Sequence, residues 1–249
     1  MDTKTYKIVM SIPSEGHTLP EAYDNHIILS FHLGKLEAEW KQQKRNPLYE
    51  FYWHTAGRLL TPLAREKLVR VALEMKADYI LMYDDDMLLP LDMVERMIED
   101  IEKHPEIDIL APLAFMRSPP HWAVIYTSTE GYDAERRCTY FFNEFVKKYP
   151  KDKLVECDAV GFGAVLINTR IYKKMKEPYF FTTTATGEDI YHCYKAKKEA
   201  NARIFVDTRI KLGHIAQPAI IDEAYFEKFI KDHKIEVPNI VHKYLRYEK

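Results

Sequence analysis

Three consecutive aspartates, Asp84, Asp85 and Asp86, end a run of apolar and aromatic residues that predicts a buried strand over residues 78–84. Carboxylates near a protein core lose hydration and repel one another, so they need a cation or strong hydrogen-bond donors to stay charged. Because side chains alternate along a strand, we expect Asp84 and Asp86 on one face and Asp85 on the other. Ligands of open α/β sheets bind at the carboxyl ends of strands, so the cluster favours a divalent metal site. The alternative is that the acids cap the helix near Pro90 or face solvent.

A second group of acids stands at the predicted start of a helix over residues 187–200. Thr186 and Asp189 have the spacing of a capping box, and acids are favoured in a first helical turn, so helix capping alone would explain Glu188 and Asp189. The functional alternative is that one of these carboxylates points into a cleft and acts as a general base toward a hydroxyl group.

His214 follows Gly213 shortly after the strand predicted over residues 203–207. A single histidine is more often a hydrogen-bonded structural residue than a ligand. Together with the aspartates, however, one imidazole and two carboxylates suit an octahedral Mn²⁺ or Mg²⁺ ion whose other positions take phosphate oxygens and water. The nitrogen favours Mn²⁺, and Zn²⁺ would prefer more nitrogen or sulfur ligands.

The elements that must position these residues alternate between strand and helix, which predicts an α/β fold with an at least partly parallel sheet. The predicted strands cover residues 6–12, 48–54, 78–84, 107–115, segments within 154–168, and 203–207. The predicted helices cover residues 21–43, 61–75, 90–104, 187–200 and a stretch from residue 222. A short turn is expected over residues 212–215. The irregular aromatic stretch 118–156 predicts either antiparallel strands or a lid.

Composition narrows the class of protein further. The 249 residues include 36 Lys and Arg against 38 Asp and Glu, a formal net charge of −2 that argues against a nucleic-acid-binding surface. The 47% hydrophobic content supports a real core, and the three cysteines have neither disulfide-framework nor zinc-knuckle spacing. Without a signal-peptide pattern or a run of ~18 apolar residues, we expect a cytoplasmic protein with no transmembrane segment.

The ordered set of motifs resembles the GT-A fold glycosyltransferases, specifically small nucleotide-sugar transferases of the family 2 type that carry a DxD motif. The matching segments are, in chain order, residues 6–15, 64–69, 79–86, 161–163, 187–189 and 213–214. The resemblance implies a Rossmann-like, mixed but mainly parallel sheet flanked by helices. It implies one GT-A domain over residues 1–221, followed by a helical extension over residues 222–249.

The resemblance also implies roles for particular residues. Nucleotide contacts are expected from Pro13, Ser14, Glu15, Arg65, Asp84 and Asp85. Metal contacts are expected from Asp84, Asp86 and His214, with Mn²⁺ or Mg²⁺ as the ion. Asp189 matches the acid that serves as base in inverting members, and Glu188 is expected to orient substrate hydroxyls. The implied reaction moves a sugar from a nucleoside-diphosphate sugar to the hydroxyl of a carbohydrate or other acceptor, with UDP preferred and GDP the runner-up.

Several other side chains are candidates for substrate contact. Aromatic rings pack against the C–H faces of sugars, so Trp122, Tyr126 and Phe162 are candidate platforms, with core packing as an equal alternative. Gly161 and Gly163 flank Phe162 and are also candidates for substrate contact. Arg117 follows a predicted strand end and would bind phosphate or a sugar hydroxyl, unless it is a solvated surface residue.

Other functions share parts of this pattern. A retaining GT-A transferase has the same fold and DxD motif, and a metal-dependent nucleotidyltransferase or phosphoester hydrolase could use the same acids. Nucleotidyltransferases of related architecture carry a glycine-rich basic loop after the first strand, whereas residues 13–17 here contain one glycine and no lysine or arginine. A non-catalytic nucleotide- or carbohydrate-binding module is the remaining alternative.

Overall fold

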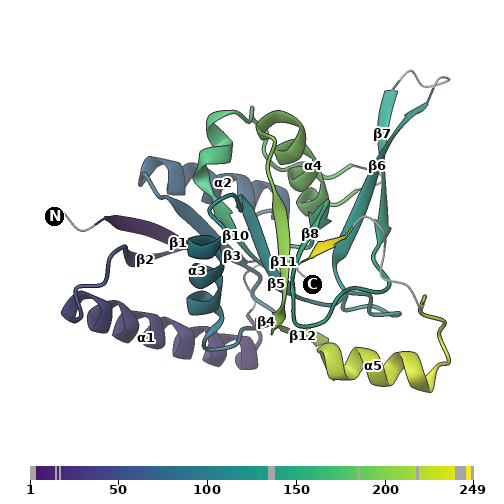
Figure 1. The fold of residues 1–249 in the computed structure, drawn as a ribbon, viewed down its shortest axis with the longest axis horizontal. Coiled ribbons are helices and arrows are strands. Elements are labelled where there is room, and N and C mark those ends of the chain that lie inside the picture. The colour runs from purple at the N-terminus through teal and green to yellow at the C-terminus, as the bar shows by residue number, and fades with distance from the viewer. Residues whose placement is uncertain are drawn as a thin grey trace.

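A mixed eight-stranded sheet forms the centre of the molecule (Figure 1). The computed structural model describes residues 4–14, 16, 18–133, 138–183, 186–216, 219–238 and 245–247. In spatial order the strands are β14 (Arg246–Tyr247), β8 (Leu154–Cys157), β11 (Ile204–Lys211), β5 (Ile109–Leu113), β10 (Ala164–Asn168), β3 (Tyr79–Tyr83), β1 (Thr5–Ser14) and β2 (Leu48–Gly57). Strands β1, β2, β3, β5 and β11 share one direction, whereas β8 and β10 run against them. The predicted mixed, mainly parallel sheet is therefore confirmed.

Helices cover both faces of this sheet, as the alternation of elements predicts. On one face lie α1 (Pro20–Gln42) and α3 (Met93–Lys103), and on the other lie α2 (Thr61–Glu74) and α4 (Glu188–Ala200). Leu29 and Leu33 of α1 stand one helical turn apart and are buried against the sheet. On α3, the predicted spacing of apolar residues by three and four positions is confirmed. Its residues Val94, Ile98 and Ile101 are all buried against the sheet.

The middle segment forms an antiparallel hairpin that projects from the body of the molecule (Figure 1). Strand β6 (Ile125–Asp133) pairs with β7 (Cys138–Phe145), and the base of β6 pairs with β9 (Ala159–Val160). Asn143 Nδ2 donates a hydrogen bond to Thr186 Oγ1 at 3.0 Å, which ties the hairpin to the segment that leads into α4. Of the two predictions for this stretch, antiparallel strands are confirmed.

A second small sheet brings His214 to the aspartates. Strand β12 (Gly213–Ala216) pairs with β13 (Ala219–Ile221) and β4 (Met87–Leu88), which sets His214 opposite Met87. The predicted turn over residues 212–215 is therefore wrong. Glycine suits the start of this strand, because a Cβ at residue 213 would lie 2.9 Å from Ile220 Cγ2 and 3.2 Å from Leu88 Cβ.

The C-terminal part packs onto the same body. Of the expected helical extension over residues 222–249, α5 (Glu223–Asp232) is helical, whereas residues 246–247 form β14 in the main sheet. The Phe226 ring of α5 stacks on Phe115 with centroids 5.1 Å apart. The 3₁₀ helix η1 (Thr169–Lys173) follows β10 on the other side of the molecule. In the segments that the structure describes, no helix combines the length and the apolar character needed to cross a membrane.

Candidate active site

A cavity of about 390 Å³ opens at the carboxyl ends of β1 and β3, where open α/β sheets bind their ligands. Its walls come from the ends of β1 and β3 and from the starts of α1 and α2. The lining residues are Pro13, Ser14, Leu19, Leu59, Thr61, Ala64, Asp84, Asp85, Asp86 and Arg117. The predicted contacts of Pro13 and Ser14 thus face the same space as the aspartates, whereas Glu15 lies outside the described residues.

All three aspartates reach this cavity, because the strand stops before them. β3 ends at Tyr83, and the Met87 N–H donates to Asp84 O at 3.3 Å, closing a turn over Asp84–Asp86. The strand alternation expected to turn Asp85 away is therefore wrong. Buried Asp85 Oδ2 has no hydrogen-bond partner in the described part of the chain, which leaves an acceptor available beside the cavity.

Asp86 lies beside His214 and Arg117 at the cavity. Its Oδ2 lies 3.2 Å from His214 Nε2 and 3.0 Å from Arg117 NH1. Burial by itself would raise the pKa of Asp86, but the hydrogen bond from His214 and the nearby charges outweigh it and lower that pKa. Burial likewise lowers the pKa of His214, yet the hydrogen bonds to Asp86 and Phe115 reverse the effect and the net shift is upward.

The ring orientation of His214 suits a metal ligand. Nδ1 lies 2.8 Å from Phe115 O, and a carbonyl can only accept, so Nδ1 carries a proton and Nε2 faces Asp86. Metal-bound histidines characteristically donate their other N–H to a carbonyl or carboxylate in this way. Among the residues described, no three His, Cys, Asp or Glu side chains enclose a metal ion on their own. A pair of protein ligands fits an ion that shares its shell with substrate phosphates and water.

Arg65 connects the aspartates to the start of α4. Its side chain is only 3% exposed, its NH2 lies 2.8 Å from Asp84 Oδ1, and its Nε lies 3.4 Å from Glu188 Oε1. The guanidinium also lies over the Phe162 ring, 5.2 Å from its centroid. Arg65 is not among the described residues that line the cavity; it packs behind Asp84 and holds that carboxylate in place. A buried cation shared by two carboxylates fixes both of them relative to each other.

The charges of Glu188 and Arg65 act on Asp189. Burial raises the pKa of Asp189 to about 6, with a further rise from Glu188 and an opposing effect from Arg65. Burial raises the pKa of Asp84 to about 6 as well, again opposed by Arg65. A carboxylate with a pKa near 6 is still ionised at neutral pH but accepts a proton more readily than an ordinary aspartate, as a general base must.

The capping box is not the arrangement seen at α4. The N-cap residue is Gly187, and no side chain of the described residues caps it. Asp189 Oδ1 accepts from the adjacent Ile190 N–H at 2.7 Å, and Thr186 Oγ1 accepts from Asn143 instead of serving the helix. The predicted capping box is therefore wrong, whereas both acids do lie in the first turn of α4, where the helix dipole favours them.

Glu66, next to Arg65, anchors the segment that precedes α4. Its Oε2 accepts from the N–H groups of Tyr179 and Phe180 at 2.8 and 3.1 Å, and the residue is 7% exposed. We expect Glu66→Ala to lower the free energy of unfolding by about 2–5 kcal/mol, because two buried donors lose their acceptor. Urea denaturation measures this loss.

Glu74→Ala is the matched control for that variant, since Glu74 is exposed on the same helix. It should change the free energy of unfolding by less than about 0.5 kcal/mol. Equal stability of the two variants would contradict an anchoring role for Glu66.

Of the aromatic candidates for substrate contact, Trp122 and Phe162 are buried in the core and Tyr126 is partly buried. Trp122 is 9% exposed and packs against Phe226, and Phe162 is 1% exposed beneath Arg65. Gly161 fits closely beside the core, because a Cβ there would lie 2.8 Å from Val124 Cβ, and Gly163 faces the Met87 side chain. Tyr126 differs, since it is only partly buried at the edge of the core, where its ring packs against Phe145 with centroids 4.6 Å apart. Burial raises the pKa of Tyr126, and the negative charge of Asp189 adds to that rise.

Four cavity residues were not anticipated from the sequence: Leu19, Leu59, Thr61 and Ala64. Only their positions in the sequence could have indicated these residues, since Leu19 follows β1 and the other three follow β2 at the carboxyl edge of the sheet. Leucines in loops, and a threonine and an alanine in the first turn of a helix, carry no chemical signature of their own, so only the strand order could have singled them out.

The comparisons concern the fold. No protein-family model matches the chain, and no curated protein matches its sequence. Among solved structures, A197 from STIV has a TM-score of 0.57 at 16% identity, covering 96% of this chain and 100% of that one. Apo UDP-glucose pyrophosphorylase has a TM-score of 0.48 at 8% identity, covering 91% and 98%. S. aureus TarS 1–349 has a TM-score of 0.42 at 14% identity, covering 86% and 59%. The likeness to A197 from STIV confirms that the α/β fold extends over nearly the whole chain.

Proposed function

We propose that this chain is a metal-dependent glycosyltransferase that moves a sugar from a nucleoside-diphosphate sugar, with UDP as the preferred nucleotide, to an acceptor hydroxyl with inversion. The observation that carries the proposal is a cavity with Asp84, Asp85 and Asp86 on its wall, linked through Arg65 to a second acid pair, Glu188 and Asp189. One set suits the donor phosphates, and the other suits proton removal from an acceptor.

The cavity has parts that fit each portion of such a donor. Leu19 and Leu59 offer apolar surface to a planar base, and Ser14 and Thr61 offer hydroxyls. Arg117 is 63% exposed at the same cavity and can pair with a phosphate oxygen. The donor would thus lie with its base toward β1 and β2 and its phosphates toward the aspartates.

Asp86 and His214 would hold the divalent ion, with Asp84 beside it. When bound, that ion supplies Lewis-acid stabilisation of the negative charge on the departing diphosphate. Arg117 would share that charge from the cavity rim. Arg65 would keep Asp84 and Glu188 at a fixed separation, so that the donor and the acceptor side of the site stay aligned.

Asp189 would take the proton from the acceptor hydroxyl as the oxygen attacks the anomeric carbon from the side opposite the diphosphate. One displacement of this kind inverts the configuration at that carbon. Glu188, bound to Arg65, would orient substrate hydroxyls. The Tyr126 side chain near Asp189 would form part of the acceptor surface.

Charge favours this function over nucleotidyl transfer. A nucleoside triphosphate brings more negative charge than a diphosphate sugar, and a nucleotidyltransferase must also stabilise departing pyrophosphate. Among the described residues that line the cavity, Arg117 is the sole cation, against three aspartates. Such a lining suits a diphosphate better than a triphosphate.

Donor binding can be tested by thermal shift with UDP, GDP, CMP and ADP, each with Mn²⁺, Mg²⁺ or EDTA. At about 100 times the dissociation constant, a bound nucleotide should raise the melting temperature by ~5–10 °C. We expect the largest shift with UDP and Mn²⁺, and its loss in EDTA. A shift that persists in EDTA would contradict the metal role, and no shift with any nucleotide would contradict the donor site.

A further inference from the structure

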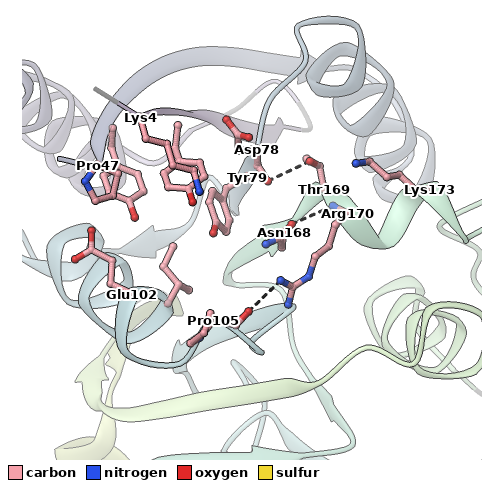
Figure 2. Close-up of a pocket in the computed structure, with 13 residues that line it drawn as sticks. Lys4, Pro47, Asp78, Tyr79, Glu102, Pro105, Asn168, Thr169, Arg170 and Lys173 are labelled. Atoms are coloured by element: carbon pink, nitrogen blue, oxygen red, sulfur yellow. Dashed lines mark hydrogen bonds between the residues drawn. The ribbon is translucent and has the colours of Figure 1, made fainter. Parts of the chain in front are cut away.

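A second cavity, of about 600 Å³, lies at the opposite edge of the sheet (Figure 2). Strand β3 joins the two: Tyr79 at its first position lines the second cavity, and Asp84 just beyond its end lines the first. At ~3.3 Å per residue the two cavities are separated by roughly 16 Å along the strand. The second cavity therefore cannot belong to the donor site.

Three tyrosines from three neighbouring strands form one side of this cavity. Tyr6 of β1 pairs in register with Tyr49 of β2, and their rings stack with centroids 5.3 Å apart. Tyr79 of β3 meets Tyr6 edge to face at 5.8 Å. Figure 2 shows Tyr79 pointing into the space between Glu102 and Asn168. The cavity therefore combines aromatic surface with phenol hydroxyls.

A phenol hydroxyl can both donate and accept a hydrogen bond. Tyr49 is 1% exposed and Tyr79 is 9% exposed, and burial raises the pKa of Tyr79 to about 12. The Tyr49 hydroxyl already meets the Glu102 carboxylate. The hydroxyls of Tyr6 and Tyr79 therefore supply the hydrogen-bonding capacity that the tyrosines offer a ligand, which core packing by phenylalanine or leucine would not require.

The charges around the cavity largely cancel. Arg170 Nε lies 2.6 Å from Asp108 Oδ1, and Glu102 Oε1 accepts from Arg45 NH2 at 2.9 Å. Asp78 Oδ2 accepts from the Lys7 N–H at 2.9 Å. The charged residues that line the cavity are three cations, Lys4, Arg170 and Lys173, against two carboxylates, Asp78 and Glu102. This small net charge gives the cavity little field to attract a multiply charged nucleotide.

We propose that this second cavity binds a saccharide. Sugar hydroxyls need closely spaced donors and acceptors, which the phenols, the Asn168 amide and the Asp78 carboxylate provide. The apolar C–H surface of a sugar ring needs aromatic or aliphatic contact, which the tyrosines and Ile101 provide. The near cancellation of charge favours a neutral sugar. This inference does not depend on the proposed transferase activity.

Saturation-transfer NMR and calorimetry with cellotetraose, maltotetraose and chitotetraose test the proposal. We expect at least one tetrasaccharide to bind the wild-type protein, with UDP and Mn²⁺ present or absent. The double variant Tyr6→Phe/Tyr79→Phe keeps both rings and removes two hydroxyls. It should bind that tetrasaccharide ~10–100-fold more weakly, since each lost hydrogen bond weakens binding ~3–10-fold.

Tyr23→Phe, on the exposed surface of α1, is the matched control and should leave binding unchanged. An unchanged melting temperature of the double variant would show that its fold is intact. The proposal is overturned if no tetrasaccharide binds, if the double variant binds as tightly as wild type, or if UDP displaces the saccharide. Binding of inorganic phosphate in place of every saccharide would also overturn it.

Discussion

Replacement of Asp86 by alanine is expected to abolish metal-dependent nucleotide binding, with an affinity loss of about 100-fold or more. Asp86 is the carboxylate that faces His214 at 3.2 Å, so its removal deletes one of the two protein ligands of the proposed ion. It also leaves Arg117 without its partner at the cavity rim. Loss of a residue that only orients a metal ligand typically costs about 10–100-fold in metal affinity, so loss of a ligand should cost at least as much. Calorimetric titration with UDP in Mn²⁺ measures the effect.

Two controls distinguish loss of the ion from loss of the fold. Asp92→Ala removes an exposed carboxylate that pairs with Arg96 on α3 and should leave nucleotide binding unchanged. The melting temperature of the Asp86→Ala protein without ligand should stay close to that of wild type. Nucleotide binding by Asp86→Ala that retains its affinity and its dependence on Mn²⁺ would contradict the assignment of Asp86.

Replacement of Asp189 by asparagine is expected to remove sugar transfer while leaving donor binding nearly intact. A positioned general base typically contributes 10²–10⁴-fold to the rate, so the turnover number should fall by about that factor. Asp189 is not among the described residues that line the donor cavity, so the affinity for UDP should change by less than about 3-fold. Equal losses of transfer and of UDP affinity would indicate that Asp189 is a structural residue.

The pH dependence provides a second test of the same role. Burial raises the pKa of Asp189 to about 6, and a general base works only when it is unprotonated. The rate should therefore be level above a pH of about 6.5 and fall about tenfold per pH unit well below 6. Asp84 titrates in the same range, so the assay should use saturating donor. A wild-type rate that stays level down to pH 5 would contradict the role of Asp189.

Much of the architecture could be predicted from local patterns. The buried strand before Asp84, the amphipathic stripe of α3 and the helix after Gly187 each have a strong periodicity or a clear boundary. The site at the carboxyl edge followed from the parallel strands. The expected alternation of the three aspartates failed because β3 ends at Tyr83, and the end of a strand is set by its pairing partners rather than by its own residues.

The remaining features depend on contacts between distant segments. His214 lies 128 positions from Asp86 in the sequence, and only the pairing of β12 with β4 brings them together. The packing of α2 against the sheet buries the Arg65 side chain beside Asp84, a contact that no local pattern predicts. Aromatic residues give no local sign of their burial: Trp122 lies in the core, whereas Tyr126 is only partly buried at its edge. The tyrosines of the second cavity meet only through strand register.

The central claim is sugar transfer from a nucleoside-diphosphate sugar, and the phosphorus product identifies the reaction most directly. The protein with Mn²⁺ would be incubated in one sample with UDP-sugars and carbohydrate acceptors, and in another with UTP and sugar 1-phosphates, each followed by ³¹P NMR. We predict release of UDP in the first sample, abolished by Asp189→Asn, and no pyrophosphate in the second. Pyrophosphate formation from UTP without UDP release from any UDP-sugar would contradict glycosyl transfer and identify a nucleotidyltransferase.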